Sequence, residues 1–329
     1  MYKRIVCLCI GMVSCLMMHA AMPLSERAQI ALLTCTPGSE LYSRYGHTSI
    51  RVTDPANHLD VVFNYGCFSF DTDHFYYKFV KGETYYELGV EDAASFLTDY
   101  QIEHRPVFFQ VLNLNYLQRQ QLFDRLVENA KPQNCKYLYN FVFDNCATRP
   151  YYIIKEVIGD SILSPYEGWT GKSFREFIHT YTGEGSWEDF GINMVFGRRA
   201  DEPMTNEQRL FLPEELMNYL SKATTIDGIP VVSRQFTGEF THPRVPWYKT
   251  WYFGVLIFTI ILVLINIRDW ERGKLSWGVD VALGVVYLLL AALIIFLIFF
   301  SIHPLVGLNW RVFLFPIIHL CTRFIYLIH

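Results

Sequence analysis

The chain lacks a large excess of charge of either sign: 28 Lys and Arg residues stand against 32 Asp and Glu residues, for a formal net charge of −4. A near-neutral chain has no electrostatic reason to bind nucleic acid, so we expect no such partner. The sequence also lacks internal repeats and low-complexity tracts, and beyond its first segment it has no CxxC pair and no His-rich spacing. We therefore expect neither a structural zinc site nor any cofactor.

Apolar residues make up 51% of the chain and gather at its two ends. At the N-terminus, two basic residues precede an apolar run from Ile5 to Met18, and small residues follow it. That order is typical of a secretory signal peptide, and the run is shorter than the roughly 20 residues that span a bilayer. We predict a signal peptide over residues 1–22. The alternative is a weak lipidation signal that makes Cys15 an anchor.

The C-terminal region contains three further apolar runs, at Trp251–Ile267, Gly278–Phe300 and Val312–Ile328. The first two match membrane-spanning helices in length. The third contains Arg323, which is costly inside a bilayer unless it lies near an interface. We predict a transmembrane region over residues 246–329 with about three spans.

The loop between the first two spans is rich in positive charge, with Arg268, Arg272 and Lys274 close together. The positive-inside rule places such a loop in the cytoplasm. The region before the first span then lies outside, as a signal peptide also requires. We predict a periplasmic catalytic domain over residues 23–245, attached to the inner (cytoplasmic) membrane.

Within this domain the pattern mixes strands and helices, which indicates an α+β fold. The predicted strands lie near residues 48–52, 60–65, 84–90 and 106–114, with the first two paired as a hairpin. The predicted helices cover residues 92–100 and 115–129, the second with Asn115 as its N-cap.

A third helix is predicted from Pro150, which is tolerated only in the first turn of a helix. The helix must then begin close to Asn145 or Cys146, and Gly159 ends it. A thiol at a helix N-terminus meets unpaired N–H groups and the positive end of the helix dipole, which lower its pKa. The same N–H groups are suited to stabilise an oxyanion. We predict that Cys146 is a nucleophile.

A nucleophilic thiol needs a base, and His47 at the start of the first predicted strand is our candidate. Gly46 before it allows a close approach of the backbone. A third residue should orient the imidazole, and we favour Asn64 over His58. The alternative is that His47 is an ordinary core or surface histidine.

The exported domain contains four cysteines: Cys35, Cys67, Cys135 and Cys146. In an oxidising compartment they allow two disulfides, or one of them is a free reactive thiol. A Cys135–Cys146 disulfide is the alternative to a catalytic Cys146.

Five motifs occur in a recognisable order: Tyr45–Val52, Phe63–Gly66, Lys78–Gly82, Phe143–Arg149, and Ser301–Pro304 followed by Asn309. Together they resemble the Lnb-type lipoprotein N-acyltransferase family of Bacteroides-like bacteria, whose fold is expected to be a permuted papain-like (NlpC/P60-like) domain followed by transmembrane helices. The resemblance assigns the catalytic pair to His47 and Cys146. Arg311 departs from it by replacing an asparagine, and relatives often continue into further membrane helices.

Other residues beside these motifs are candidates for substrate binding, although aromatic residues at such places also serve as core. They are Tyr45, Tyr65, Tyr139 and Arg149 in the periplasmic domain and His303 in the membrane region. His303 is expected to face an acyl chain or headgroup; the alternative is interfacial anchoring beside Trp310.

The resemblance implies an acyltransferase with a cysteine nucleophile. Such an enzyme moves an acyl chain from a membrane phospholipid, through a Cys thioester, to the N-terminal amine of a diacylglyceryl-cysteine lipoprotein. Two other functions are compatible with the same sequence features. One is a membrane-tethered cysteine peptidase or amidase acting on cell-wall peptide, and the other is a non-catalytic envelope protein.

Overall fold

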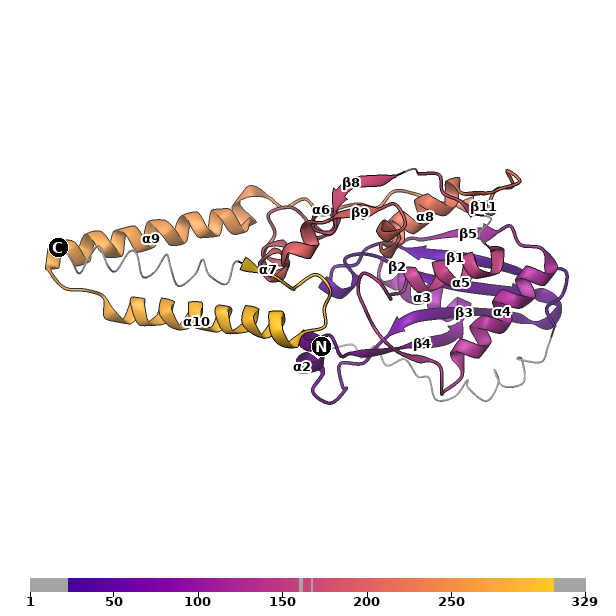
Figure 1. Cartoon of the computed structure of the whole chain (residues 1–329), viewed down its shortest axis with the longest axis horizontal. Coiled ribbons are helices and arrows are strands. Elements are labelled where there is room, and N and C mark those ends of the chain that lie inside the picture. The colour runs from indigo at the N-terminus through magenta and orange to yellow at the C-terminus, as the bar shows by residue number, and fades with distance from the viewer. Residues whose placement is uncertain (1–22, 160–161, 167, 311–329) are drawn as a thin grey trace. The chain divides into compact units, whose positions relative to one another are not determined.

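A computed structural model gives the structure of residues 23–159, 162–166 and 168–310 (Figure 1). The predicted signal peptide and the third predicted span lie outside these described residues. The chain divides into two compact units. The first runs through Gly171 and resumes at Met204–Thr241, and the second comprises Lys172–Pro203 and the chain from His242 onward.

The first unit is built on a seven-stranded antiparallel sheet with the strand order β11-β5-β1-β2-β3-β4-β6. Its strands are β1 (Gln29–Cys35), β2 (His47–Asp54), β3 (Leu59–Cys67), β4 (Tyr85–Asp92), β5 (Val107–Leu112), β6 (Lys136–Leu138) and β11 (Val232–Phe236). The remaining strands, β7 (Ile162–Leu163), β8 (Trp169–Ser173), β9 (Pro203–Thr205) and β10 (Thr224–Thr225), form two small pairs, β7 with β10 and β8 with β9.

The four predicted strands are confirmed, and β2 and β3 form the predicted hairpin, with Ile50 opposite Phe63 and Asp54 opposite Leu59. The sequence did not predict β1, the central strand that pairs with both β2 and β5. Almost all of β1 is buried, so its sequence is a continuous apolar run rather than an alternating one. Periodicity alone does not distinguish such a run from a buried helix.

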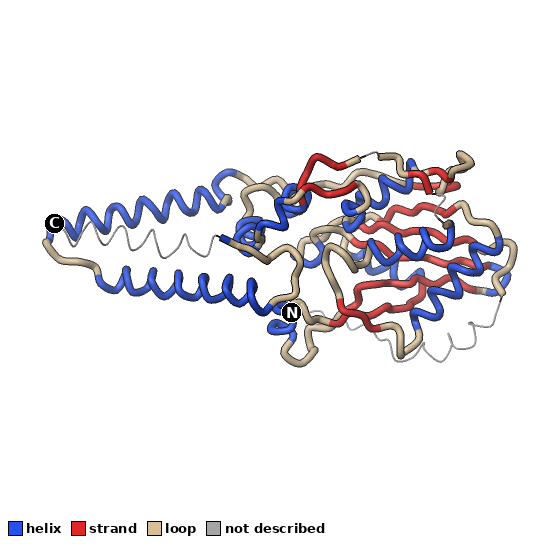
Figure 2. Tube along the Cα trace, viewed as in Figure 1, coloured by secondary structure: helices blue, strands red, loops and turns tan. Residues whose placement is uncertain are grey.

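Helices cover both faces of this sheet (Figures 1 and 2). The helices of the first unit are α2 (Phe75–Lys81), α3 (Ala93–Ile102), α4 (Tyr116–Ala130), α5 (Thr148–Ile158) and α8 (Pro213–Lys222). Buried side chains of α4, α5 and α8 form the main core with one face of the sheet. On the other face, Phe96 of α3 packs with Leu33 and Val62. The mixed α/β architecture agrees with the predicted α+β class.

The predicted N-cap Asn115 of α4 is confirmed, whereas α5 begins at Thr148, two residues after Cys146. The side chain of Asn115 accepts a hydrogen bond from the Gln118 backbone at 2.9 Å, and the Gln118 side chain accepts one from the Asn115 backbone at 3.0 Å. This reciprocal arrangement satisfies N–H groups that the first turn of α4 leaves free. Helix α5 contains Pro150 in its first turn and ends before Gly159, as the sequence predicted.

The entry into α5 is held by Asn145, which is 2% exposed. Its Oδ1 accepts hydrogen bonds from the N–H groups of Ala147 and Thr148 at 2.8 and 2.9 Å. Its Nδ2 donates to the carbonyl oxygens of Phe141 and Phe211 at 2.7 and 2.8 Å. One buried amide therefore joins the start of α5 to two other segments of the first unit.

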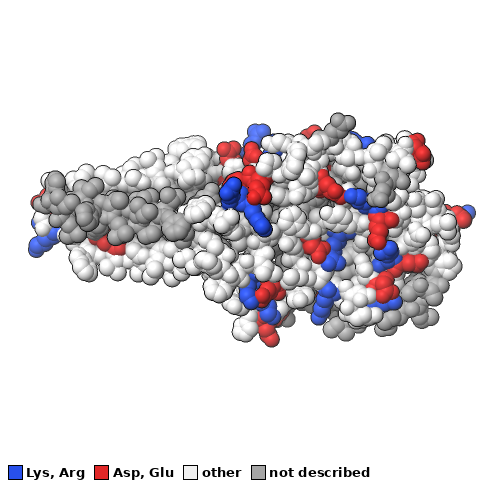
Figure 3. Space-filling view, in the orientation of Figure 1, with Lys and Arg blue, Asp and Glu red and all other residues white. Residues whose placement is uncertain are grey.

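The second unit contains the two long apolar helices α9 (Trp251–Arg272) and α10 (Trp277–Phe300). Both are long and apolar enough to cross a membrane, which agrees with the first two predicted spans. In the view of Figure 3, few charged side chains lie along these helices. The unit also contains α6 (Phe174–Thr182), α7 (Trp187–Val195) and the short helices η3 (Arg198–Asp201) and η5 (Trp247–Lys249).

The sequence did not predict that residues 172–203 belong with the membrane helices. The link between α6 and α7 contacts the start of α9, where the Trp251 N–H donates to the Gly185 carbonyl at 2.9 Å. In α7, the Phe190 ring lies 5.1 Å from the Trp251 ring. Short helices such as these carry no sequence signal for the element on which they pack.

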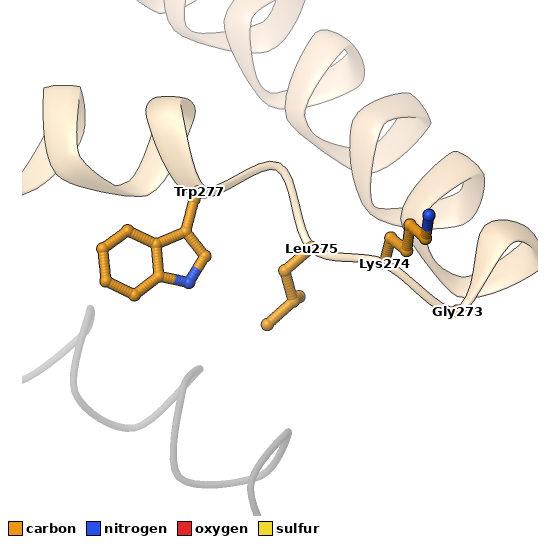
Figure 4. A pocket seen from close by; sticks show the side chains of 4 residues that line it. All are labelled: Gly273, Lys274, Leu275 and Trp277. Carbon is orange, nitrogen blue, oxygen red and sulfur yellow. The ribbon is translucent and has the colours of Figure 1, made fainter.

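A pocket at the turn between α9 and α10 is lined by Gly273, Lys274, Leu275 and Trp277 (Figure 4). Lys274 is the titratable residue of this lining, and no thiol, imidazole or carboxylate is among the four residues. The pocket therefore lacks the thiol and imidazole of the predicted catalytic pair.

We predict that Asn145→Ala destabilises the first unit by about 2–4 kcal/mol, because it removes a helix cap and leaves buried carbonyl groups without donors. The exposed cap Asn115 provides the control, and Asn115→Ala should cost only about 1 kcal/mol. Thermal and denaturant unfolding of the full-length protein in detergent measures both changes. Equal losses of stability in the two variants would contradict this account of Asn145.

Candidate functional site

Cys146 directly precedes Ala147, the N-cap of α5, and is 9% exposed. The backbone N–H groups of Thr48 in β2 and of Cys146 itself favour the thiolate form of this sulfur and so act to lower its pKa. The nucleophile predicted at a helix start thus lies against the first residues of the strand that begins with His47.

The strands β2 and β3 separate at this end of the hairpin. Their paired register ends at Ile50 and Phe63, while β3 continues to a bulge between Tyr65 and Cys67. The bulge is at Gly66, which has a φ of 97°, in the region that favours glycine. The sheet therefore opens where Cys146 approaches β2.

Gly66 marks the centre of the site. A Cβ placed on this glycine would lie 3.5 Å from the Cβ of Cys146, 3.9 Å from Cε1 of His47 and 3.9 Å from Cε2 of Tyr139. The structure thus brings together Cys146, His47 and Tyr139, which are far apart in the sequence. Glycine leaves space between them that a side chain would occupy.

Gly46 fixes where β2 begins. Its φ is 78°, and a Cβ there would lie 2.7 Å from the Cys35 carbonyl oxygen and 2.8 Å from the ring of Phe240. The close approach expected of Gly46 is therefore made to Cys35 in β1 and to Phe240. Any larger residue would displace His47, which follows directly.

A chain of hydrogen bonds leads from the His47 ring into the sheet. Its Nε2 lies 2.6 Å from Oδ1 of Asn64, and Nδ2 of Asn64 donates to Oε1 of Glu91 at 3.1 Å. An ionised carboxylate only accepts hydrogen bonds, so Glu91 fixes the Asn64 amide with its oxygen toward the histidine. His47 must then donate from Nε2, which leaves the lone pair of its neutral ring on Nδ1.

The protonation states of the pair differ from the prediction. Burial raises the pKa of the Cys146 thiol to about 11, against the opposing effect of the two backbone N–H groups. Loss of hydration also lowers the pKa of His47 to about 4, although part of its surface remains accessible. The predicted lowering of the thiol pKa was wrong, because desolvation outweighs the helix terminus. At neutral pH the resting pair is a neutral thiol beside a neutral imidazole.

The expected use of the helix N-terminus also needs correction. The N–H groups of Ala147 and Thr148 donate to Asn145, so they are already occupied. The N–H groups that favour the thiolate are those of Cys146 and Thr48. The polar environment for a developing negative charge therefore comes from the helix entry and from β2 together.

Of the predicted substrate-binding tyrosines, Tyr139 borders the site and Tyr65 is buried. Tyr139 borders Gly66, and its ring stacks on Tyr86 with 4.1 Å between centroids. Tyr65 is 1% exposed, and its hydroxyl accepts a hydrogen bond from Asn129 at 2.9 Å. Tyr65 is therefore part of the core and does not line an accessible pocket, which corrects its predicted role.

Arg149 and Tyr45 make contacts within the first unit. The Arg149 guanidinium binds the Asp144 carboxylate through two hydrogen bonds of 2.6 and 2.8 Å and lies 3.6 Å from the centroid of the Tyr137 ring. Tyr45 packs edge-on against Phe141 at 4.7 Å. These contacts hold the loop that leads to Cys146.

The two remaining histidine candidates lie elsewhere. His58 is in the turn between β2 and β3, at the opposite end of β2 from His47, so it does not orient that ring. His303 belongs to the second unit, where its N–H donates to the Ser301 hydroxyl at 3.3 Å.

Within the described residues Cys35, Cys67, Cys135 and Cys146 form no disulfide, so neither the predicted alternative of two disulfides nor a Cys135–Cys146 bond is present. Cys35 is buried opposite His47 in the β1–β2 register, and burial raises the pKa of its thiol to about 12. Among the residues that the structure describes, no three His, Cys, Asp or Glu side chains gather as metal ligands.

Sequence analysis missed Thr48, Gly66 and Glu91 as parts of the site. Glu91 lies on the same sheet face as Asn64, one strand away, because Asn64 pairs with Gly89 and side chains alternate along β4. Only the register between β3 and β4 shows this neighbourhood. Gly66 was visible as a glycine at the end of a predicted strand, which is a signal for a bulge.

We predict that iodoacetamide alkylation of Cys146 in the full-length protein accelerates about tenfold per pH unit between pH 7 and 10, because its pKa is raised to about 11. Peptide mass spectrometry measures the rate at each pH. His47→Ala should leave this slope unchanged, since burial sets the thiol pKa. A plateau beginning below pH 7 would instead indicate a thiolate–imidazolium pair and contradict the neutral pair.

We predict that Asn64→Ala slows acylation of Cys146 by 4-nitrophenyl acetate about 10²-fold, because the base loses its orientation and tautomer. The release of 4-nitrophenol measures the rate. Ser49→Ala is the matched control, since the Ser49 hydroxyl lies 3.5 Å from the same Asn64 oxygen, and it should change the rate less than about twofold. If both variants slowed acylation equally, Asn64 would not be the residue that orients His47.

Comparison with known proteins gives two matches. Residues 22–170 match the Lnb N-terminal periplasmic domain, and residues 247–329 match the Lnb transmembrane domain. No curated protein and no solved structure is similar enough to match. The two matches follow the order of the predicted periplasmic and transmembrane regions, and the first includes both Cys146 and His47. This chain is therefore a membrane protein of the Lnb family, with an N-terminal periplasmic domain and a C-terminal transmembrane domain.

Proposed function

We propose that the protein is an apolipoprotein N-acyltransferase of the inner membrane, with Cys146 as nucleophile and His47 as general base. The observation that carries the proposal is the meeting of Cys146 and His47 around Gly66, with the His47 tautomer fixed through Asn64 and Glu91. In this proposal residues 1–22 are a signal peptide, residues 23–245 are the catalytic domain with a permuted papain-like fold, and residues 246–329 span the membrane.

The first half-reaction acylates the enzyme. Nδ1 of His47 takes the thiol proton as the sulfur of Cys146 attacks the ester carbonyl of a membrane phospholipid. The carbon–sulfur bond forms and the carbon–oxygen bond of the ester breaks. The proton then passes from His47 to the departing alkoxide, and a lysophospholipid leaves.

The second half-reaction transfers the acyl chain. The N-terminal α-amine of a diacylglyceryl-cysteine lipoprotein attacks the thioester, and its pKa of about 7.7–8.0 leaves a useful neutral fraction at pH 7. His47 takes a proton from the attacking nitrogen and returns it to the sulfur as the carbon–sulfur bond breaks. The products are an amide and the free thiol.

Two properties of the site suit this reaction. A neutral resting pair moves one proton within each half-reaction and requires no buried ion pair beforehand. Burial of Cys146 limits contact of the thioester with water, which favours aminolysis over hydrolysis. In tetrahedral intermediates, we assign charge stabilisation to the N–H groups of Cys146 and Thr48, which already favour the thiolate.

The membrane helices favour this function over a cell-wall peptidase or amidase with the same pair. Both substrates of an N-acyltransferase reside in the bilayer, whereas a peptidase with a water-soluble substrate needs only one anchor. Helices α9 and α10 provide at least two candidate spans within the described residues.

We predict that the full-length protein in phospholipid nanodiscs forms an acyl thioester on Cys146, seen by mass spectrometry as one added acyl group that neutral hydroxylamine removes. Cys146→Ala should abolish it, and His47→Ala should slow it at least about 10²-fold. Cys135→Ala, which removes another free thiol, should leave it intact.

In cells, the same Cys146→Ala change should remove the N-linked acyl chain from lipoprotein N-terminal peptides. An unchanged lipoprotein acylation pattern in that strain would exclude the N-acyltransferase. Cleaved cell-wall peptide without a thioester-linked lipid would indicate the peptidase or amidase, and full activity of the alanine variant would indicate a non-catalytic protein.

A further inference from the structure

The Lys78–Gly82 motif lies in α2, a seven-residue helix to which the proposed chemistry assigns no role. In Figure 1, α2 and its flanking loop project beyond the ends of β3 and β4. Several large aromatic side chains of this region are exposed to solvent, which is unusual for residues of this size. The group, here called the α2 patch, consists of Tyr42, Phe70, Tyr76, Tyr77 and Phe79, with exposures of 53%, 54%, 75%, 57% and 50%.

Ring contacts connect four of the five patch residues, Tyr42, Phe70, Tyr76 and Phe79, through the buried Phe75. The Tyr42 ring lies 6.2 Å from that of Phe70, and Phe70 lies 5.0 Å from Phe75, the buried residue of α2. Phe75 in turn contacts Tyr76 at 5.6 Å and stacks on Phe79 at 6.0 Å. Contiguous exposed apolar surface of this kind marks a site of membrane or partner interaction.

A row of rings joins the patch to the reactive thiol. Tyr139, which borders Gly66 beside Cys146, stacks on Tyr86 at 4.1 Å. Tyr86 stacks on Phe68 at 4.9 Å, and Phe68 contacts Phe70 of the patch at 4.9 Å. An apolar path therefore runs from the nucleophile to the exposed surface.

Electrostatic attraction does not account for a partner of the α2 patch. Lys78 and Lys81 of α2 are balanced by Asp71 and Asp73 in the preceding loop, and Lys81 pairs with Glu83 at 2.7 Å. The partner that fits is thus an apolar one that tolerates phenol groups at its boundary with water. Tyrosine favours the interfacial layer of a bilayer, where its ring is buried and its hydroxyl is hydrated.

A short link tethers the first unit to the first apolar helix. The link from Thr241, the last residue of the first unit, to Trp251 at the start of α9 extends at most about 36 Å. The first unit therefore stays close to the bilayer in which its proposed acyl donor resides.

We propose that the α2 patch inserts into the periplasmic leaflet and takes up the acyl chain of a phospholipid, which then lies along Phe68, Tyr86 and Tyr139 with its ester at Cys146. The inference rests on the proposed acyl transfer and adds the place where the donor lipid is bound. The patch acts by binding the lipid, and it takes no part in proton transfer.

The test uses the full-length protein in nanodiscs that contain phosphatidylglycerol with a photoreactive diazirine near the end of one acyl chain. Irradiation should label Tyr76 and Phe79 at least about fivefold more than Tyr85, with fragment-ion spectra assigning the label to single residues and separating Tyr85 from Tyr86. Tyr85 is a matched reference, because it is 65% exposed and its side chain points to the sheet face opposite that of Tyr86. Labelling should be the same in Cys146→Ala, since it reports binding alone.

A variant pair tests the role in catalysis. Tyr76→Ser combined with Phe79→Ser should slow thioester formation about tenfold or more, while iodoacetamide alkylation of Cys146 stays within about twofold of the wild-type rate. Tyr85→Ser should leave both rates unchanged. The retained alkylation rate shows that the site is folded, so a slow thioester step then reports lost lipid binding.

The outcomes separate the two proposals. Patch labelling without any thioester would support the lipid surface and overturn the acyltransferase. Thioester formation with labelling no stronger at Tyr76 and Phe79 than at Tyr85 would overturn the lipid surface and keep the acyltransferase. Cross-links from the patch to a second protein copy in place of lipid would also overturn it.

Discussion

The separation of β2 from β3 at Gly66 is the constraint on which the site depends. While the two strands stay paired, their backbone N–H groups are used within the sheet. Beyond Ile50 and Phe63 the strands diverge, and the entry to α5 lies against the freed end of β2. The bulge at Gly66 and the left-handed Gly46 thus determine where Cys146 and His47 meet. Asn145 then holds the helix entry in that position.

Burial determines the electrostatics of the pair. A helix N-terminus stabilises a thiolate by a fraction of what desolvation costs when the sulfur is enclosed by protein. The side chain of Asn145 also occupies two of the helix N–H groups. The result is a thiol and an imidazole that are both neutral, with the imidazole tautomer set by Asn64 and Glu91. Such a pair suits chemistry that moves one proton at a time in a site with little water.

The aromatic residues of the first unit connect this buried site to the outside. Most soluble domains bury rings of this size, yet the region around α2 exposes them next to a stacked row that leads inward. A membrane-tethered domain has a use for such a surface, because its environment includes hydrocarbon as well as water.

The sequence by itself determined the local structure: the strands with alternating patterns, the Asn115 cap, the start of α5 set by Pro150, and two apolar spans. Each follows from interactions within a few residues of the chain. It also predicted Cys146 as nucleophile from a helix start, His47 as its base and Asn64 as the residue that orients the imidazole. Only the tertiary structure decided the protonation of the thiol, the place of Tyr65 in the core and the participation of Thr48 and Glu91. Desolvation and strand register are properties of residues distant in sequence, so no local pattern contains them.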